Sequence, residues 1–352
     1  MSYLIYGAYG YTGTLIAREA VRQGHEPVLA GRDRRRLEPL GARLGLKTQV
    51  VSLDAPERLR AAVADVPAVL HCAGPYSNTA APMAAACLHA GTHYLDLTGE
   101  IPVLQGLAGR SATAEERRVL LLPAVGFDVV PSDCLARALS ERCPDASTLE
   151  IALEGVGGVS NGTLKTAVEQ MGAGGWVRRN GDLVAVPAGW STRRVRFRDG
   201  ERPVISIPGA DLVTAAHSTA IPNVTVYLSL PRPLQQLVRL SRHVQGLLGW
   251  GPLQDLLKRA IERWVPDPSV QDRERGRTAV WASVRAPDGT RQTARLQGPH
   301  AYTFTARAAV AAARRVVDGP PAVGFQTPAT AFGADFVEGL EGVTVEIGTD
   351  PA

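Results

Sequence analysis

The stretch Gly7-Ala-Tyr-Gly10-Tyr-Thr-Gly13 decides the fold. A short apolar run, Leu4–Tyr6, precedes it, and a helical pattern follows over Gly13–Gln23. Glycines at this spacing permit a tight turn, a close approach of the backbone to a pyrophosphate, and close packing of the helix on the strand. The N–H groups and the positive dipole end of the new helix then face an anion. The stretch therefore predicts a dinucleotide-binding loop.

Length and composition indicate a soluble globular protein of two domains. The chain has 352 residues, of which 45% are hydrophobic and 20% are charged. It contains no apolar run long enough to cross a bilayer, and it enters the first strand directly, so we expect no integral membrane segment and a cytoplasmic location. The net charge is +4, and the arginines that dominate the basic residues are scattered. We therefore expect no nucleic-acid partner.

The four cysteines show no metal-binding pattern. Cys72, Cys87, Cys134 and Cys143 have no Cys-x-x-Cys pairing and no ligand spacing with histidine. They fit buried thiols in a reducing compartment. We therefore predict no metal site.

The first 130 residues alternate between strand and helix patterns. We expect strands at Leu4–Tyr6, Pro27–Ala30, Gln49–Leu53, Ala68–Cys72, His93–Leu97 and Val119–Val125. Helical patterns fill the gaps at Gly13–Gln23, Asp33–Leu44, Ala55–Ala64, Ala80–Ala90 and Ile101–Ala114. Apolar strands that alternate with helices predict an α/β fold, a Rossmann-type doubly wound parallel sheet covered on both faces. Ligands of such sheets bind at the carboxyl ends of the strands.

The pattern changes after Pro131. A helix over Ser132–Arg142 leads to strands at Thr148–Glu154, Asp182–Val186, Arg193–Phe197, Pro203–Ile207, Val224–Leu228, Thr278–Ala286 and Thr290–Gln297. The hairpin signal Pro287-Asp288-Gly289 indicates antiparallel pairing. We therefore predict a second, α+β domain on a mixed or antiparallel sheet over residues 131–300. The helix Phe304–Val317 is expected to return to the first domain, which would comprise residues 1–130 and about 300–352.

The end of the second strand indicates which cofactor is bound. The sequence there is Leu29-Ala30-Gly31-Arg32-Asp33. Folds that select NAD place a carboxylate at this strand end for the ribose hydroxyls, whereas NADP requires a cation. Gly31 stands where the carboxylate would be, and the Arg32 guanidinium can bind a phosphate through paired donors. Asp33 fits a helix cap equally well. We therefore predict NADP(H).

Polar residues follow several of the expected strands and supply the candidate site. Tyr76 is expected to flank the nicotinamide, Asp128 to transfer a proton, and Lys165 to protonate or bind a carbonyl. The predicted cofactor-binding residues are Gly7, Tyr9, Gly10, Tyr11, Thr12, Gly13, Arg32, Asp54, Ala73, Gly74, Pro75, Tyr76, Gly99, Glu100, Gly126, Phe127 and Asp128. The alternative is that Asp96, Asp128 and Asp133 bond loop backbone and cap the next helix.

Together these motifs resemble the saccharopine dehydrogenase-like family of NADP-dependent oxidoreductases. The resemblance rests on Gly7–Gly13, Ala30–Arg32, Ala73–Tyr76, His93–Glu100 and Gly126–Asp133. Two weaker matches, Gly162-Thr-Leu164 and Gly324-Phe-Gln-Thr-Pro328, are similar to the branch that contains trans-acting enoyl reductases. The resemblance implies a Rossmann domain, NADPH, and a second domain that often supports dimerisation.

We expect hydride transfer to a C=C or C=N bond in a cleft between the domains, on a small molecule that is apolar or carrier-bound. One alternative is an imine reductase of amino-acid metabolism, for which Arg178, Arg179, Arg193 and Arg194 could bind carboxylates. Another alternative, of a different class, is a non-catalytic NADP-binding sensor.

Residues 234–265 carry two short amphipathic helical patterns with arginine and lysine on one side. One interpretation is a helix pair that covers the second sheet. The other is a lid or a lipid-contacting surface for an apolar substrate.

Overall fold

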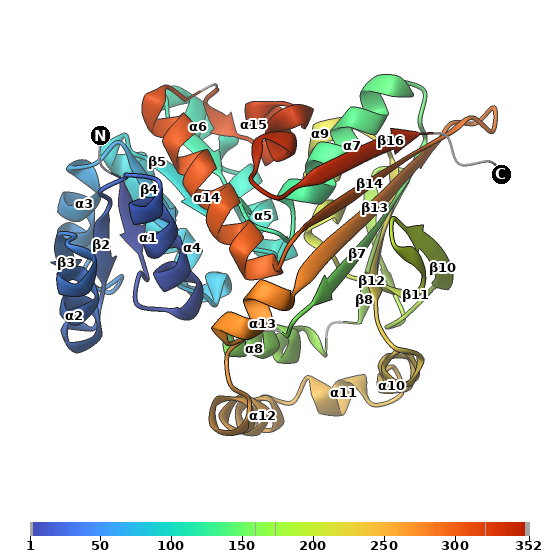
Figure 1. Ribbon diagram of the computed structural model, residues 1–352, viewed down its shortest axis with the longest axis horizontal. Helices are drawn as coiled ribbons and strands as arrows, with labels where there is room; N and C mark the ends of the chain where they lie inside the picture. The colour runs from blue at the N-terminus through green and yellow to red at the C-terminus, as the bar shows by residue number, and fades with distance from the viewer. Residues whose placement is uncertain (1–2, 159, 173, 321, 349–352) are drawn as a thin grey trace. The chain divides into compact units, whose positions relative to one another are not determined.

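The computed structural model describes residues 3–348 apart from residues 159, 173 and 321 (Figure 1). The chain divides into two compact units. The first comprises Met1–Val130 and Tyr302–Glu341, and the second comprises Pro131–Ala301 and Gly342–Ala352. We expected the C-terminal return to reach residue 352, but the strand β16 (Thr344–Gly348) belongs to the second unit.

The first unit is built on a seven-stranded parallel sheet, which confirms the predicted fold class. Its order is β15-β6-β5-β4-β1-β2-β3, so the strand order reverses between β1 and β4. Ile5, Leu29 and Leu70 on its central strands are 0% exposed. The strands are β1 (Leu4–Tyr6), β2 (Val28–Gly31), β3 (Thr48–Val50), β4 (Ala68–His71), β5 (His93–Asp96), β6 (Leu120–Leu122) and β15 (Gly324–Phe325).

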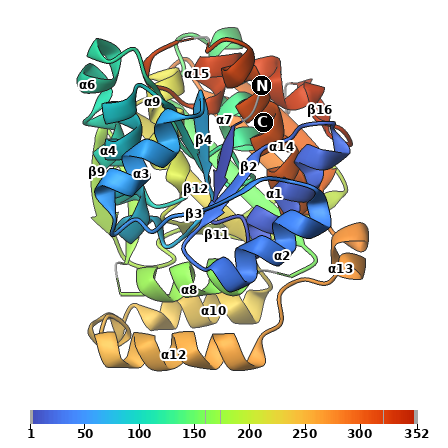
Figure 2. The same cartoon turned by 90° about the vertical axis from the view of Figure 1, so that its left-hand side faces the viewer.

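Helices lie on both faces of this sheet (Figures 1 and 2). They are α1 (Tyr11–Arg22), α2 (Arg34–Leu44), α3 (Pro56–Ala64), α4 (Tyr76–Ala90), α5 (Ile101–Ala108), α6 (Ser111–Glu116), α14 (Ala301–Asp318), α15 (Pro328–Phe332) and the 3-10 helix η2 (Ala334–Gly339). The helix predicted over Ile101–Ala114 is in fact two helices. The helix α5 ends at Ala108 with Gly109 as its C-cap, and Arg110 adopts a non-helical backbone before α6.

The second unit is built on a mixed nine-stranded sheet. The main order is β10-β11-β12-β7-β13-β14-β16, and β8 pairs with β12 and β9. Only the β12–β7 pair is parallel among the described residues. Its strands besides β16 are β7 (Thr148–Val156), β8 (Gly175–Arg179), β9 (Asp182–Val186), β10 (Thr192–Phe197), β11 (Gly200–Ile207), β12 (Asn223–Ser229), β13 (Arg277–Arg285) and β14 (Arg291–Pro299).

The helices of the second unit are α7 (Val130–Arg142), α8 (Asn161–Gln170), the 3-10 helix η1 (Ala210–Leu212), α9 (Thr214–Thr219), α10 (Arg232–Ser241), α11 (Gln245–Leu248), α12 (Gly251–Trp264) and α13 (Val270–Arg275). The expected hairpin is present, because β13 and β14 pair in antiparallel register across Asp288. The strand β8 was not predicted, since its short run Gly-Trp-Val-Arg-Arg lacks a clear apolar alternation. Leu149 and Ile151 of β7 are buried, as expected for one core-facing side of a strand.

Candidate functional site

The loop between β1 and α1 has the tight geometry that its glycines predict. Gly7 has a φ of +80°, in the left-handed region, and its N–H donates to the Ala30 carbonyl of β2 at 2.8 Å. A Cβ at Gly13 would lie 2.4 Å from the Gly7 carbonyl oxygen. Only glycine therefore fits at Gly13 without moving backbone.

The start of α1 is suited to an anion. Its N-cap is Gly10, which offers no side-chain acceptor for the first N–H groups of the helix. The first helical hydrogen bond runs from the Thr14 N–H to the Gly10 carbonyl at 2.9 Å. The first turn holds no acidic residue that would repel a phosphate. Uncapped N–H groups at a helix start bind phosphate readily, so this turn fits a pyrophosphate.

The end of β2 presents an arginine and no competing carboxylate. Arg32 is exposed. The Asp33 carboxylate accepts from the Arg35 N–H at 2.9 Å and the Arg36 N–H at 3.3 Å, and so caps α2. The Arg36 guanidinium lies 4.8 Å from the centre of the Tyr9 ring. The capping alternative for Asp33 is thus observed, and Arg32 is left at the strand tip.

Tyr9 occupies the space that a longer residue at position 31 would need. A Cβ at Gly31 would lie 2.5 Å from Cε1 of the Tyr9 ring. Asp54, which follows β3, is exposed and accepts from the Ser52 hydroxyl at 3.1 Å. A side chain at position 31 would therefore require the Tyr9 ring to move.

The loop after β4 contacts the glycine loop. A Cβ at Gly7 would lie 2.8 Å from the Cβ of Ala73. The Tyr76 hydroxyl donates to the His71 carbonyl at 3.3 Å, and burial raises the pKa of Tyr76 well above its ordinary value. This hydroxyl is a poor proton donor to a substrate, so any contribution of Tyr76 to the site comes from its ring beside Gly74.

Glu100 holds the start of α4 in place. Its carboxylate accepts from the Tyr76 N–H at 2.9 Å and the Ser77 N–H at 2.8 Å, and the residue is 7% exposed. This is an N-cap supplied by a neighbouring loop. It also explains why α4 begins at Tyr76, four residues before the predicted start at Ala80.

Asp96 clamps the loops after β5 and β6. Its carboxylate accepts from the Tyr94 hydroxyl at 2.6 Å and from the Thr98 and Ala124 N–H groups at 2.9 Å. The residue is fully buried, and this burial raises its pKa to about 6. The backbone-bonding alternative is therefore observed for Asp96.

We call residues 7–13, 31–33, 71–77 and 96–100 the strand-end rim. It contains one buried residue that the sequence analysis missed, His71 at the end of β4. Both ring nitrogens of His71 lack a hydrogen-bond partner within the described part of the chain, and burial lowers its pKa to about 3. The rings of Tyr6 and Tyr76 each lie 5.5 Å from it, centre to centre. The sequence signal that could have identified His71 is that it is the single polar residue of the apolar strand β4.

The loop after β6 is held mainly by α14. The Phe127 N–H donates to the Thr305 hydroxyl at 3.1 Å, and a Cβ at Gly126 would lie 3.1 Å from Cγ2 of Thr305. Asp128 is exposed, but desolvation by the surrounding atoms raises the pKa of its carboxyl group. Its Oδ2 would lie 3.3 Å from a Cβ at Gly99, so that glycine leaves room for the carboxylate. Tyr11 packs edge-on against Tyr302 of α14, at 5.0 Å.

In the second unit, Lys165 of α8 forms an ion pair with Glu262 of α12. Three of the four arginines proposed for carboxylate binding make hydrogen bonds or ion pairs within the chain, and the guanidinium of the fourth, Arg179, lies 5.4 Å from the centre of the Trp190 ring. Arg178 donates to the Leu212 and Gly181 carbonyls, Arg193 pairs with Glu150, and Arg194 pairs with Glu201.

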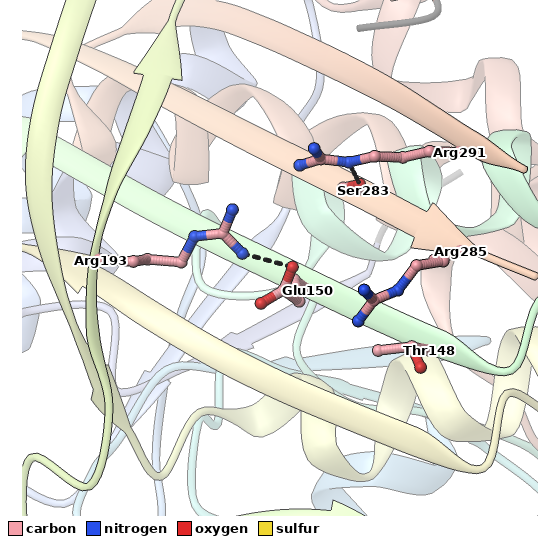
Figure 3. A pocket seen from close by; sticks show the side chains of 6 residues that line it. All are labelled: Thr148, Glu150, Arg193, Ser283, Arg285 and Arg291. Atoms are coloured by element: carbon pink, nitrogen blue, oxygen red, sulfur yellow. Dashed lines mark hydrogen bonds and ion pairs between the residues drawn. The ribbon is translucent and has the colours of Figure 1, made fainter. Parts of the chain in front are cut away.

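A cavity of about 160 Å³ lies beside Arg193 on the second sheet (Figure 3). Arg285 and Arg291 also line it, and Arg291 donates to the Ser283 hydroxyl at 3.0 Å. Glu150 is the one carboxylate among its lining residues, so the cavity carries an excess of positive charge.

Comparisons with known proteins agree with the rim geometry. Residues 3–122 match the family of saccharopine dehydrogenase NADP binding domains. This confirms the resemblance that the motifs indicated and the predicted cofactor, NADP(H). The uncapped start of α1 and the exposed arginine at the tip of β2 suit that cofactor.

Two curated relatives are named trans-acting enoyl reductase, from Mycobacterium leprae and from Mycobacterium tuberculosis H37Rv. Each is 35% identical over 158 residues, which cover 42% of this chain and 37% of the relative. The chain thus matches less than half of the length of these relatives. The saccharopine dehydrogenase (L-Glu forming) of Saccharomyces cerevisiae has the same fold, with a TM-score of 0.70 and 11% identity, covering 99% of this chain and 100% of that one.

Proposed function

We propose that this chain is an NADPH-dependent oxidoreductase that reduces a C=C or C=N bond of a small or carrier-bound molecule. The observation that carries the proposal is the strand-end rim, where an uncapped α1 start lies beside a strand tip that offers Arg32 and no free carboxylate. The relatives named enoyl reductases favour the C=C bond.

The chain's own residues would act mainly by positioning. When bound, NADPH supplies a hydride, and transfer of a hydride depends chiefly on the distance and orientation of the partners. Gly10 and the first turn of α1 would hold the pyrophosphate, and Arg32 the additional phosphate of NADP. The Asp96 and Glu100 hydrogen bonds keep the surrounding loops rigid. Asp128, exposed in the loop after β6, is the remaining proposed proton carrier.

The experiment that tests the proposal follows NADPH absorbance with two substrate panels, enones and preformed imines. We expect consumption with the enones. Consumption with imines alone would select the alternative, an imine reductase. Tight NADPH binding without consumption of either panel would contradict an enzyme and support the non-catalytic sensor.

A second candidate function, imine reduction on an amino acid, has one observation in its favour. Arg285 and Arg291 line the 160 Å³ cavity of the second sheet and make no ion pair within the described residues, so they could bind a substrate carboxylate. Replacing both with glutamine should then raise the KM for a carboxylate-bearing imine and leave the KM for its methyl ester unchanged. We also propose a homodimer, which the family resemblance supports and which sedimentation velocity would test.

A further inference from the structure

The helices α10 to α12, residues 232–264, expose an unusual number of large apolar side chains. Leu237 and Leu240 of α10 are each 63% exposed, as is Leu256 of α12, and Trp264 is 75% exposed. Trp250, between α11 and α12, is 58% exposed. Large apolar side chains gathered on one surface segment mark a site of interaction rather than ordinary surface. We call residues 232–264 the outward segment.

Two ion pairs connect α12 to α8. Lys258 pairs with Glu169 at 2.8 Å, and Glu262 pairs with Lys165, so both ion pairs run between α12 and α8. Leu256, Ala260 and Trp264 recur every four residues and therefore share the opposite face. Leu253, Leu257 and Ile261 form the half-buried apolar side that faces the unit, so the exposed Leu256 and Trp264 are apolar side chains that packing within the unit does not use.

In α10 the buried residue is polar and the leucines are exposed. Gln235 is 7% exposed and donates to the Leu230 carbonyl at 2.9 Å. Leu234 and Leu237, one turn apart, are 47% and 63% exposed. Two neighbouring helices thus expose large apolar side chains, and α10 does so while it buries a glutamine, which points to a partner that contacts apolar side chains. Figure 1 shows α10, α11 and α12 along one edge of the second unit, and Figure 2 shows α10 and α12 along the same edge.

The charge of the segment selects the partner. It contains six basic and two acidic residues, an excess equal to the +4 of the entire chain. Arg259 and Arg263 are exposed on α12, next in helical position to Leu256. A basic helix with tryptophan and leucine on one face binds in the interface of an anionic membrane. None of the described helices is long and apolar enough to span a bilayer. We propose that the outward segment binds peripherally to an anionic lipid bilayer.

Vesicle co-sedimentation of the full chain tests this proposal. One set of vesicles contains phosphatidylcholine alone, and the other also contains roughly 30% of the anionic lipid phosphatidylglycerol. We expect binding to the anionic vesicles, at least fivefold weaker binding to the neutral ones, and weakening by salt. The double variant Leu237→Gln/Leu256→Gln should reduce the bound fraction at least fivefold. Its unfolding midpoint should stay unchanged, because both side chains are exposed. The matched control Val21→Gln removes an exposed apolar side chain of α1 and should bind like the parent chain.

A second variant tests the electrostatic part. Arg259→Gln/Arg263→Gln should lower binding to anionic vesicles and leave the weak binding to neutral vesicles unchanged. Failure of the parent chain to bind anionic vesicles would overturn the proposal. So would equal binding of the leucine variant and the parent. A dimer that the leucine variant converts to a monomer, without vesicle binding, would identify a second copy of the chain as the occupant instead. None of these readouts depends on NADPH turnover.

Discussion

In both the strand-end rim of the first unit and the outward segment of the second, polar side chains bond to other parts of the same unit. The surface that remains is polar in the rim and apolar in the outward segment. In the rim, Asp96 and Glu100 point into the structure and bond backbone N–H groups, which leaves glycines and helix N–H groups at the surface. In the outward segment, Lys258 and Glu262 bind α12 to α8, which leaves leucine and tryptophan exposed. The comparison shows that polar side chains that form hydrogen bonds or ion pairs inside the protein leave other groups at the surface. Those remaining groups determine what the surface can bind. Four predictions test the two regions, and their order is that of the expected effect.

The largest effect is expected for Gly13→Val. The new Cβ would meet the Gly7 carbonyl oxygen at 2.4 Å and the Ala8 Cα at 3.0 Å, and both are backbone atoms that cannot rotate away. We expect the free energy of unfolding to fall by more than about 3 kcal/mol, measured by urea denaturation. The control Gly106→Ala lies in α5 with nothing within 4 Å of its new Cβ and should change stability by less than about 1 kcal/mol. Equal midpoints for the two variants would contradict the tight-loop geometry.

The second prediction concerns the pH dependence of stability through Asp96. Its pKa is raised from 3.8 to about 6 in the folded chain, so the folded state binds the proton more tightly than the unfolded state. The resulting stability is fully present below about pH 4 and is lost as the pH rises through about 6. A shift of two pKa units corresponds to about 3 kcal/mol. Asp96→Asn does not titrate, so the parent should lose about that much stability relative to the variant between pH 4 and 7. A difference that is constant with pH would show that Asp96 does not titrate in this range.

The third prediction concerns cofactor choice. Arg32→Ala should weaken NADPH binding by about tenfold to a hundredfold, since a hydrogen bond to a charged group contributes about 1.5–3 kcal/mol. NADH binding should change little, because NADH lacks the additional phosphate. Isothermal titration with both cofactors measures the two affinities. Arg35→Ala, an exposed neighbour in α2, serves as the matched control. Equal losses for the two cofactors would remove Arg32 from phosphate recognition.

The smallest effect on stability is expected for the ion pair that connects α12 of the outward segment to α8. Lys165→Met and Glu262→Gln each remove the same partly exposed ion pair, so each should lower the unfolding free energy by less than about 1 kcal/mol, and by the same amount. Thermal denaturation of both variants measures this. If Lys165→Met alone also lowers NADPH consumption, the lysine acts in the chemistry, as the sequence analysis suggested.

Much of the first unit could be predicted from the sequence, because its information is local. The glycine spacing of Gly7–Gly13 specifies a backbone shape, and Gly31-Arg32 specifies a cofactor preference, without reference to distant residues. The roles of Glu100 and His71 could not be predicted, since each depends on a neighbour in another loop or strand. Glu100 was expected at the cofactor, and the structure shows its carboxylate on the Tyr76 and Ser77 N–H groups.

Less of the second unit could be predicted, because its arrangement also depends on residues that are distant in the sequence. The periodicity of residues 234–265 predicts amphipathic helices, but it does not say which side faces the sheet. That side is fixed by Glu169 and Lys165, far away in the sequence on α8. Lys165 illustrates the point, because the sequence suggested a chemical role for it and its partner Glu262 could be found only in the folded structure.

The chain's path between the units limits how the protein can be dissected. The chain passes from one unit to the other at residues 130/131, 301/302 and 341/342. A truncation after residue 130 would therefore remove α14 and strip Phe127 of its contacts with Thr305 and Phe304. The smallest autonomous NADP-binding fragment is expected to be residues 1–130 joined by a flexible linker to 302–341. Deletion and domain-swap experiments on this chain need that two-segment design, since a single cut at the apparent domain boundary would yield an incomplete fold.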